Sequence, residues 1–417
     1  MTRIPRPAII AAASVVAVSC SVPLAGSIRA ALDGGKISLA IDEAKDDAGQ
    51  LDLVAVETIR RGLDSQERQT AIDVICRHPV RLGDLLLDLS LHSEDPGAAA
   101  IARSVLYRSG SLEFEPDLEK ALASEDGGVR AAAVGALATT RGDRAFFETH
   151  ALDPDPRVRI SVLAYLVTHD SQWGQEILVE AAVSDPDPAV ARAAVAGLDP
   201  DVDGSREALV ASLGSEDAST RVAAAWALGS GGETVEGLLV QPATPEGLNH
   251  AAALLAGDPG HASASDYLEE AISAPDAQIR LTALVALTRA GVSVPGLESL
   301  QHDPSPRVRV AWCHLGRKLR TPEAEARREV LSAVIAEEAS LEALVALAEE
   351  GGTEEARPLV WWLFETGGSS VQRYIIAFAI PTFRDSALAI RGMKSPDPAV
   401  RMEAAAAWLS RSPSSSL

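Results

Sequence analysis

The chain has 417 residues, of which 47% are hydrophobic and only 4% aromatic, and its formal net charge at pH 7 is −22. An excess of carboxylates of this size repels phosphate groups, which disfavours nucleic acid as a partner and direct adsorption on anionic lipid. Because aromatic residues are scarce, alanine and leucine must supply most of any core.

The first 19 residues have the pattern of a secretory signal. Arg3 and Arg6 form a basic start, and residues 8–18 form an apolar run that is too short to span a bilayer as a helix. We therefore predict a signal peptide at 1–19. A secreted chain cleaved near Ala25, a retained anchor and a cytoplasmic chain are the alternatives.

The end of this segment, Ala17 to Cys20 (AVSC), resembles the lipobox of bacterial lipoproteins, although that motif usually has leucine where Ala17 stands. The resemblance implies that Cys20 is diacylated on its sulfur and becomes the new N-terminus. The expected localisation is the cell envelope, with the membrane contacted through a lipid anchor only. A soluble periplasmic or secreted protein is the alternative.

One helix pattern recurs after residues 20–50, which are predicted to form a tether and an N-terminal cap. In its clearest copy, Asp155 is placed to cap a helix, Pro156 suits the first helical position, and apolar residues follow at three- and four-residue spacing. The same start recurs at a mean interval of 30.2 residues, since 302 residues separate Asp95 from Asp397 in ten steps. The other starts are Ser65, Asp126, Asp187, Asp217, Thr244, Asp276, Ser305, Ser340 and Ser369.

A shorter apolar segment precedes most of these starts, so each repeat is predicted to be a pair of helices joined by a tight turn. One pair cannot bury both of its apolar faces, and neighbouring pairs must therefore stack. The pattern predicts an all-α fold, an alpha-alpha superhelix of about twelve helical pairs at 51–411, followed by a polar tail at 412–417. No change of composition divides 51–411, which predicts one elongated domain.

The turn-plus-helix segments DPDPRVRISVLAYL, DPDPAVARAAVAGL and DPSPRVRVAWCHLG resemble HEAT repeats, in particular the short bacterial type of the phycobilisome lyases. The resemblance covers most of residues 50–411. It implies a HEAT or armadillo-like solenoid in which the second helix of each pair usually lines the concave face. It does not specify a function, because such repeats serve as scaffolds in unrelated roles.

Arginines fall four residues after six of the predicted helix starts. A cation in the first turn of a helix opposes the helix dipole, so a nearby carboxylate must offset it. The cap carboxylates of the same and adjacent repeats are the expected partners, and the HEAT resemblance implies a structural ladder along the stack. An anion-binding stripe is the alternative. The residues of this predicted ladder are Asp126, Arg130, Asp155, Arg159, Asp217, Arg221, Asp276, Arg280, Arg309, Asp397 and Arg401.

The sequence contains no recognisable motif for catalysis or for a metal or cofactor. None of the eight histidines is followed by glutamate, whereas the HEAT-like deoxyhypusine hydroxylases use repeated His-Glu pairs to hold iron. No HxxxH, CxxC or Gly-rich phosphate loop occurs. Cys76 and Cys313 lie about eight repeats apart, too far to form a disulfide, and are predicted to be small buried hydrophobes. We expect no catalytic, cofactor or metal-binding residues.

Trp361 and Trp362 are the candidate interface residues. Adjacent helical side chains point about 100° apart, so both rings cannot easily share one buried stripe. One ring is therefore predicted to face solvent or a partner, and the alternative is that both fill gaps between alanine-rich layers.

These patterns predict an exported, lipid-anchored scaffold that mediates protein–protein interaction without catalysis. Two alternatives stay open. One is a phycobilin-lyase-like protein that binds a tetrapyrrole, and the other is a structural envelope protein that assembles with copies of itself.

Overall fold

A computed structural model describes residues 25–79, 82–169, 171–229, 239, 243–338, 340–383 and 385–410. In these ranges all regular structure is helical and no strand occurs, which confirms the predicted all-α class. The predicted signal peptide at 1–19, the lipid-attachment candidate Cys20 and the polar tail at 412–417 lie outside the described residues.

The helices up to residue 141 are α1 (Gly26–Asp33), α2 (Ile37–Ala44), α3 (Ala48–Gly62), α4 (Arg68–Arg77), α5 (Gly83–His92), α6 (Pro96–Arg108), the 3₁₀ helix η1 (Leu112–Phe114), α7 (Glu115–Ala121) and α8 (Gly127–Arg141). Those that follow, up to residue 290, are α9 (Arg144–Ala151), α10 (Pro156–Leu166), α11 (Gln172–Ser184), α12 (Pro188–Gly197), α13 (Ser205–Ser212), α14 (Ala218–Leu228), α16 (Pro245–Gly257), α17 (Ala262–Ile272) and α18 (Ala277–Ala290). The last are the 3₁₀ helix η2 (Leu297–His302), α19 (Pro306–Lys318), α20 (Ala324–Glu338), α21 (Leu341–Glu349), α22 (Thr353–Thr366), α23 (Ser369–Phe383), α24 (Ser386–Met393) and α25 (Pro398–Ser410).

The chain forms two compact units. Unit 1 comprises the residues up to Thr140 and those from Gly367 onward, and unit 2 comprises Arg141–Thr366. Unit 1 therefore holds both the first and the last helices of the chain, among them α1 and α2 in the region predicted as tether and cap. Predicted repeats lie on both sides of each boundary, and a single repeat domain at 51–411 stays a prediction.

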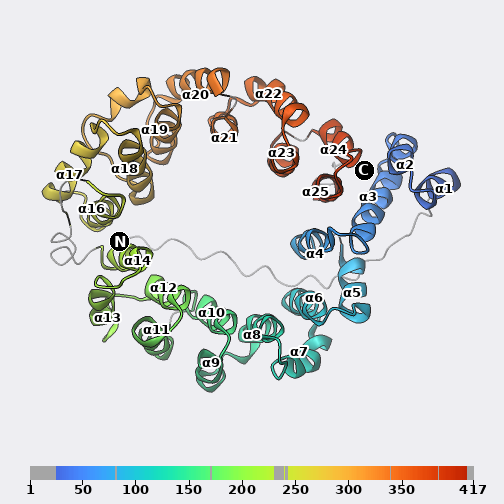
Figure 1. Ribbon diagram of the computed structural model, residues 1–417, viewed down its shortest axis with the longest axis horizontal. Helices are drawn as coiled ribbons and strands as arrows, with labels where there is room; N and C mark the ends of the chain where they lie inside the picture. The colour runs from blue at the N-terminus through green and yellow to red at the C-terminus, as the bar shows by residue number, and fades with distance from the viewer. Residues whose placement is uncertain are drawn as a thin grey trace. The chain divides into compact units, whose positions relative to one another are not determined.

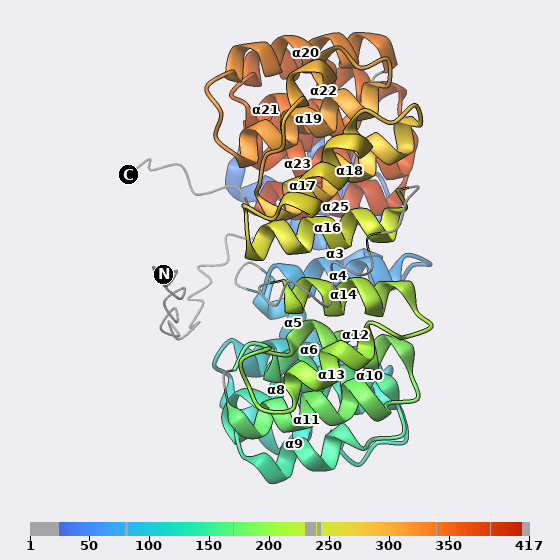
Figure 2. The ribbon, with the colours of Figure 1, turned by 90° about the vertical axis from the view of Figure 1, so that its left-hand side faces the viewer.

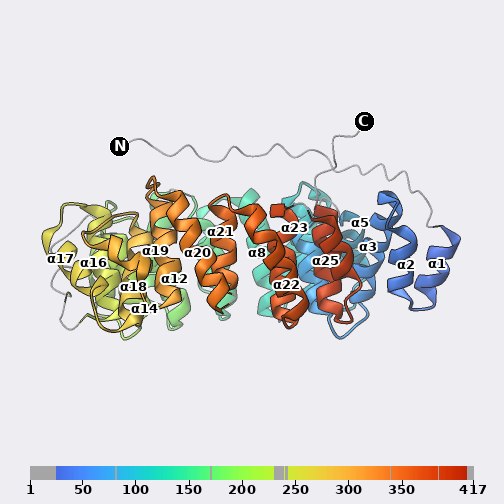
Figure 3. The ribbon, with the colours of Figure 1, turned by 90° about the horizontal axis from the view of Figure 1, so that it is seen from above.

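The helices of unit 2 stack as pairs in two layers. α9, α11 and α13 lie in one layer and α10, α12 and α14 in the other, and each helix contacts its pair partner and its neighbours in the layer (Figure 1). Figure 2 shows α12 and α14 side by side, and Figure 3 shows the same for α19, α20 and α21. This arrangement is the predicted solenoid of helical pairs, in which each pair buries the apolar face of the next.

Side-chain caps define the start of most second helices. Asp155 accepts a hydrogen bond from the Arg157 N–H at 2.9 Å, and Pro156 occupies the first position of α10. This geometry satisfies an N–H group that has no partner within the helix. The same kind of cap is made by Asp95, Asp187, Asp217, Thr244, Asp276 and Ser340.

Three predicted starts depart from this pattern, and one of them, Ser369, is itself the first residue of α23. Ser305 stands at the N-cap position of α19, but its side chain makes no cap hydrogen bond, and its own N–H donates to Asp303 Oδ1 at 2.8 Å. α4 begins at Arg68, three residues after the predicted start Ser65, and likewise has no side-chain cap. The cap predicted at Ser305 is therefore wrong. The copy that starts at Ser65 has its helix later than predicted, and Ser65 Oγ accepts the Glu67 N–H at 3.1 Å in the turn before it.

In unit 1 the last helix packs on the first repeats. α25 lies against α3 and α4 (Figure 1). Arg77 donates two hydrogen bonds of 3.0 Å to the buried carboxylate of Glu403, although the two residues are 326 positions apart in the chain. Trp408 Nε1 donates to Asp52 at 2.8 Å. The two ends of the repeat array therefore cover part of each other's apolar surface, a contact that the sequence analysis did not predict.

Candidate functional site

In the described part of the chain, seven arginines fold back across the start of their own helix. Each donates from Nη1 to the carbonyl oxygen six residues earlier, in the turn before the helix, over 2.6–3.2 Å. The bond ties the turn to the helix, and we call these seven residues the ladder arginines. With their carbonyl partners they are Arg130 and Ser124, Arg159 and Asp153, Arg221 and Ser215, Arg280 and Ala274, Arg309 and Asp303, Arg327 and Thr321, and Arg401 and Ser395.

Several ladder arginines also reach the next repeat. Nε and Nη2 of Arg159 donate to Asp185 at 2.7 and 2.8 Å, and Arg280 binds Asp303 in the same way at 2.7 and 2.9 Å. All four side chains are buried. Such a two-bond pair holds adjacent repeats in one orientation. The remaining pairs are Arg221 with Glu246, Arg309 with Glu337, and Arg327 with Glu350.

Two of these contacts lower the pKa of a carboxylate. Hydrogen bonds from Arg221 hold the pKa of Glu246 below its usual value. Burial opposes ionisation of Asp303, yet the hydrogen bonds from Arg280 and the Ser305 N–H outweigh it and lower the pKa of Asp303 as well. Because all three nitrogens of such a guanidinium donate to the protein, this geometry favours a structural role for the ladder over an anion-binding stripe.

The carboxylates hydrogen-bonded to Arg159, Arg221, Arg280, Arg309 and Arg327 are not the predicted caps, although Asp217 and Asp276 still act electrostatically on Arg221 and Arg280. The hydrogen-bonded carboxylates lie 23–28 residues further along the chain than the arginine. Asp155 instead pairs with Arg157 at 2.8 Å, and Asp217 lies 3.5 Å from Arg192. The other predicted cap carboxylates, each of which accepts an N–H from its own first turn, are Asp126, Asp276 and Asp397.

Arg327 is a ladder arginine that the sequence analysis missed. Its repeat has glutamate at the start position, where the predicted starts have Asp, Ser or Thr. It nevertheless stands four residues after Glu323, whose carbonyl accepts the Arg327 N–H, and this spacing is the signal that could have identified it.

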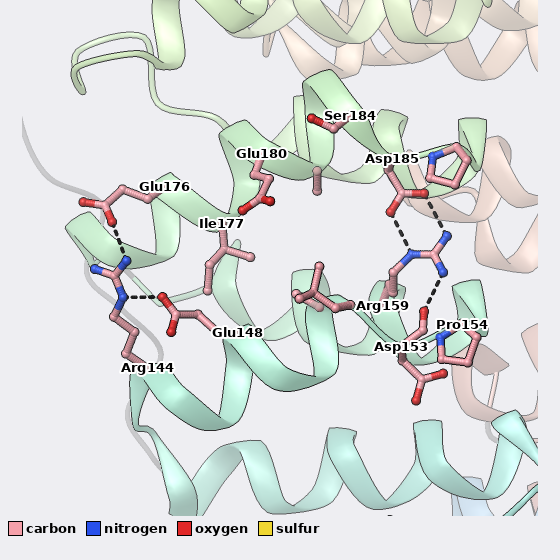
Figure 4. A pocket seen from close by; sticks show the side chains of 14 residues that line it. Arg144, Glu148, Asp153, Pro154, Arg159, Glu176, Ile177, Glu180, Ser184 and Asp185 are labelled. Carbon is pink, nitrogen blue, oxygen red and sulfur yellow. Dashed lines mark hydrogen bonds and ion pairs between the residues drawn. The ribbon is translucent and has the colours of Figure 1, made fainter.

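A cavity of about 760 Å³ lies between α9 and α11 in unit 2 (Figure 4), and we call it groove 1. Its lining is apolar in the middle, where Ile177 is buried and Leu152, just after α9, has 76% of its surface exposed. Ala151 and Ala181 complete this apolar strip. Groove 1 therefore presents unburied apolar surface that another molecule could cover.

Charged side chains stand at both ends of groove 1 (Figure 4). Arg144 donates to Glu148 at 2.6 Å and to Glu176 at 2.9 Å, and Glu180 points into the groove between its two ends. The buried ladder pair of Arg159 closes the other end. Five carboxylates and two guanidiniums line groove 1, which gives its lining a net negative charge.

The two predicted interface tryptophans lie on α22 in unit 2. Trp362 has 51% of its surface exposed, whereas Trp361 is partly buried. The difference in exposure is what adjacent positions of a helix require. Neither ring lines groove 1.

Both cysteines in the described residues are free thiols. Burial raises the pKa of Cys76 to about 11 and that of Cys313 to about 12, so both stay protonated at neutral pH. Among the residues that the structure covers, no three His, Cys, Asp or Glu side chains are grouped so that they could hold a metal ion. No helix in those residues is long and apolar enough to cross a membrane.

Comparison with known proteins gives no assignment to a family. No family model matches the chain, and no curated protein matches it. A mutant of Kap121p aligns over 85% of this chain and 52% of its own, with a TM-score of 0.31 and 13% identity. The Kap95:Nup1 complex aligns over 94% and 59%, with a TM-score of 0.29 and 13% identity. The karyopherin Kap121p bound to the extreme C-terminus of the protein phosphatase Cdc14p aligns over 88% and 49%, with a TM-score of 0.29 and 14% identity. The chain spans about half the length of these solved chains.

Proposed function

We propose that the chain is a scaffold that binds a protein partner and performs no catalysis of its own. Groove 1 carries this proposal, because it combines exposed apolar surface at Leu152 with an excess of carboxylates. The ladder pair of Arg159 and Asp185 forms one end of the groove and also joins two repeats. Because this ion pair already fixes the side chains at that end of groove 1, they lose little conformational entropy when a partner binds, which favours affinity.

The chemistry of groove 1 selects the kind of partner. An apolar side chain would cover Leu152 and Ile177, and a lysine or arginine next to it would meet Glu180. The formal charge of −22 would also speed the approach of a cationic partner. We therefore propose that groove 1 takes a segment in which an apolar residue is flanked by basic ones.

The test is a selection of displayed random peptides on the purified full chain, followed by affinity measurements on the enriched sequences. We expect enrichment of peptides that join an apolar residue to lysine or arginine. Leu152→Glu should weaken their binding by at least about tenfold, since it places a charge in the apolar strip. The matched control is Leu112→Glu in unit 1, where the leucine is 58% exposed and lies outside groove 1.

Two outcomes would count against groove 1 as the binding site. The selected peptides could bind Leu152→Glu as tightly as the unchanged chain. Alternatively, both leucine variants could lose the same affinity, which would indicate a general effect of added charge.

We also propose that the chain is exported and anchored to a membrane through Cys20. The support for this is the basic start, the apolar run at 8–18 and the lipobox-like AVSC segment. The test is fractionation of the native chain and of Cys20→Ser, together with the intact mass of the mature N-terminus. A diacylated chain in the membrane fraction, released by the substitution, is expected. An unmodified chain in the cytosol would contradict the proposal.

A further inference from the structure

A second cavity, of about 730 Å³, lies in the other helical layer of unit 2. It extends across α12, α14 and α16 and reaches α18, and we call it groove 2. Five alanines from α12 and α14 line it, so that the backbone of a bound segment could approach the helices closely. Its volume falls within the range of ordinary ligand sites.

Three ionisable side chains line groove 2, and they differ in how they are paired. Glu246 accepts two hydrogen bonds of 2.6 Å from Arg221, so its charge is balanced. Arg192 lies 3.5 Å from Asp217 Oδ2, at the outer limit of a hydrogen bond. For Arg289, no carboxylate partner is found among the residues that the structure describes. Of these three described side chains, two are cations and one is an anion that Arg221 balances, so the excess charge among them is positive.

Trp226 contacts the guanidinium of Arg289. The central carbon of Arg289 lies 4.1 Å from the centroid of the Trp226 ring, within the range of a cation–π contact. Trp226 Nε1 is in turn directed at Asn249 Oδ1, 3.5 Å away. An arginine that stacks through the face of its plane keeps its N–H donors available at the edge, where two of them match the two oxygens of a carboxylate.

We propose that groove 2 binds an extended acidic segment of a protein partner, with one of its carboxylates on Arg289 and its backbone over the alanine floor. Charge complementarity carries this inference. A chain of formal charge −22 repels an acidic partner over most of its surface, and the Arg289 cation in groove 2, which has no carboxylate partner among the described residues, is a place where such a partner can be held. The inference depends on the proposed scaffold function for its class of ligand, but not on groove 1, which lies in the other layer.

The experiment measures fluorescence anisotropy of labelled peptides titrated with the full chain. The probes are twelve-residue peptides with aspartate or glutamate at alternate positions, and their uncharged counterparts with asparagine or glutamine. We expect the acidic peptides to bind, the amide peptides to bind at least about tenfold more weakly, and added salt to weaken the acidic ones. Arg289→Gln should reduce the affinity for the acidic peptides by at least about tenfold.

Two further variants separate the site from general effects. Ala193→Trp fills the floor of groove 2 and should block binding without removing a charge. Arg206→Gln removes the same charge from an exposed position on α13, in the other layer, and should leave binding unchanged. Thermal melts of each variant show whether unit 2 stays folded.

Several results would overturn the proposal. Equal binding of acidic and amide peptides would show that charge does not select the ligand, and undiminished binding to a folded Arg289→Gln variant would place the site elsewhere. Failure of every acidic peptide to bind the unchanged chain would also overturn it. Displacement of the peptide by inorganic phosphate in an Arg289-dependent manner would reassign groove 2 to small anions. None of these results bears on whether Leu152→Glu weakens the binding of basic peptides to groove 1. The two proposals can therefore fail independently of each other.

Discussion

The ladder arginines act at the scale of single residues, because each one joins two parts of the fold. Arg159 binds the Asp153 carbonyl in its own turn at 2.7 Å and the Asp185 carboxylate of the next repeat. Removing the guanidinium would leave the buried Asp185 carboxylate without its cation, with only the Asp187 N–H still donating to it at 2.9 Å. The free-energy cost of an uncompensated buried charge exceeds the value of the lost attraction. The ladder is therefore expected to matter more to stability than the many exposed ion pairs of the chain.

Arg159→Met should destabilise unit 2 by about 3–5 kcal/mol, because Asp185 would stay buried without its cation. The measurement is urea unfolding followed by circular dichroism. Arg157→Met is the matched control, since Arg157 is exposed and pairs with Asp155, and it should cost less than about 1 kcal/mol. Similar losses for the two variants would show that Arg159 has no special structural role.

His250 is a ring in α16 with only 2% of its surface exposed. Burial lowers its pKa. Glu246, whose carboxylate lies 3.8 Å from Nε2, would favour the charged ring, but that carboxylate is already bonded to Arg221, and burial prevails. The ring is therefore neutral in the folded chain at neutral pH.

A depressed histidine pKa makes stability depend on pH. As the pH falls, the histidine of the unfolded chain takes up a proton before His250 of the folded chain does. The contribution of neutral His250 to the free energy of unfolding is therefore present above the unfolded pKa of about 6.5, and it is lost as the pH falls from there through the lower folded pKa. The thermal unfolding midpoint should fall as the pH is lowered from about 7.5 to about 5.5. His250→Leu should reduce the slope of the midpoint against pH. His314, in the same unit, also has a pKa lowered by burial, so part of the slope should persist.

His302→Leu, which removes an exposed ring in the same unit, controls for the loss of a histidine as such. A slope that is the same in the unchanged chain and in His250→Leu would mean that His250 does not titrate in this range.

At the scale of helices, the contact of α25 with α3 depends on a small residue. A Cβ added at Gly62, the last residue of α3, would lie 2.1 Å from Met402 Sδ and 3.0 Å from Ala71 Cβ. Gly62→Ala should therefore destabilise unit 1 by about 1–3 kcal/mol through overpacking. A Cβ at Gly135, in the interior of α8, meets nothing within 4 Å, so Gly135→Ala should instead stabilise by about 0.5–1 kcal/mol.

Urea unfolding of the two glycine variants measures both changes in the free energy of unfolding, which are expected to have opposite signs. The penalty of Gly62→Ala should shrink when Met402→Ala is present, because the clashing sulfur is then absent. A neutral Gly62→Ala would indicate that α25 does not pack on α3 as described.

The starts of the helices were predictable because they depend on neighbours in the chain. The Asp155 side chain and the Arg157 N–H that it caps are two residues apart, and Pro156 between them leaves few other conformations. The partner of Arg159 was not predictable, since Asp185 is 26 positions away and several other carboxylates lie equally near in the repeat pattern. The cavity of groove 1 depends on how α9 and α11 pack against each other. Side-chain packing sets that arrangement, and the spacing of apolar residues in the sequence does not predict it.

At the scale of the whole molecule, the contact between the ends of the repeat array and the two proposed binding grooves lie in different units. Unit 1 contains both ends of the repeat array, and the pair of Arg77 and Glu403 links them. Such a contact removes an apolar end face, which open repeat arrays must otherwise cover with special terminal repeats. Periodicity alone did not indicate it, because it joins residues that are 326 positions apart. Unit 2 contains both proposed binding grooves, one in each of its layers.

Amide hydrogen exchange is the measurement that tests the proposed binding function most directly. The full chain would be compared alone and with a saturating basic peptide taken from the selection on groove 1. Slower exchange in α9 and α11, with α12, α14 and all of unit 1 unchanged, is the predicted result, because these two helices form the groove. Slower exchange confined to other helices, or none in any helix, would contradict the assignment of groove 1 as the partner site.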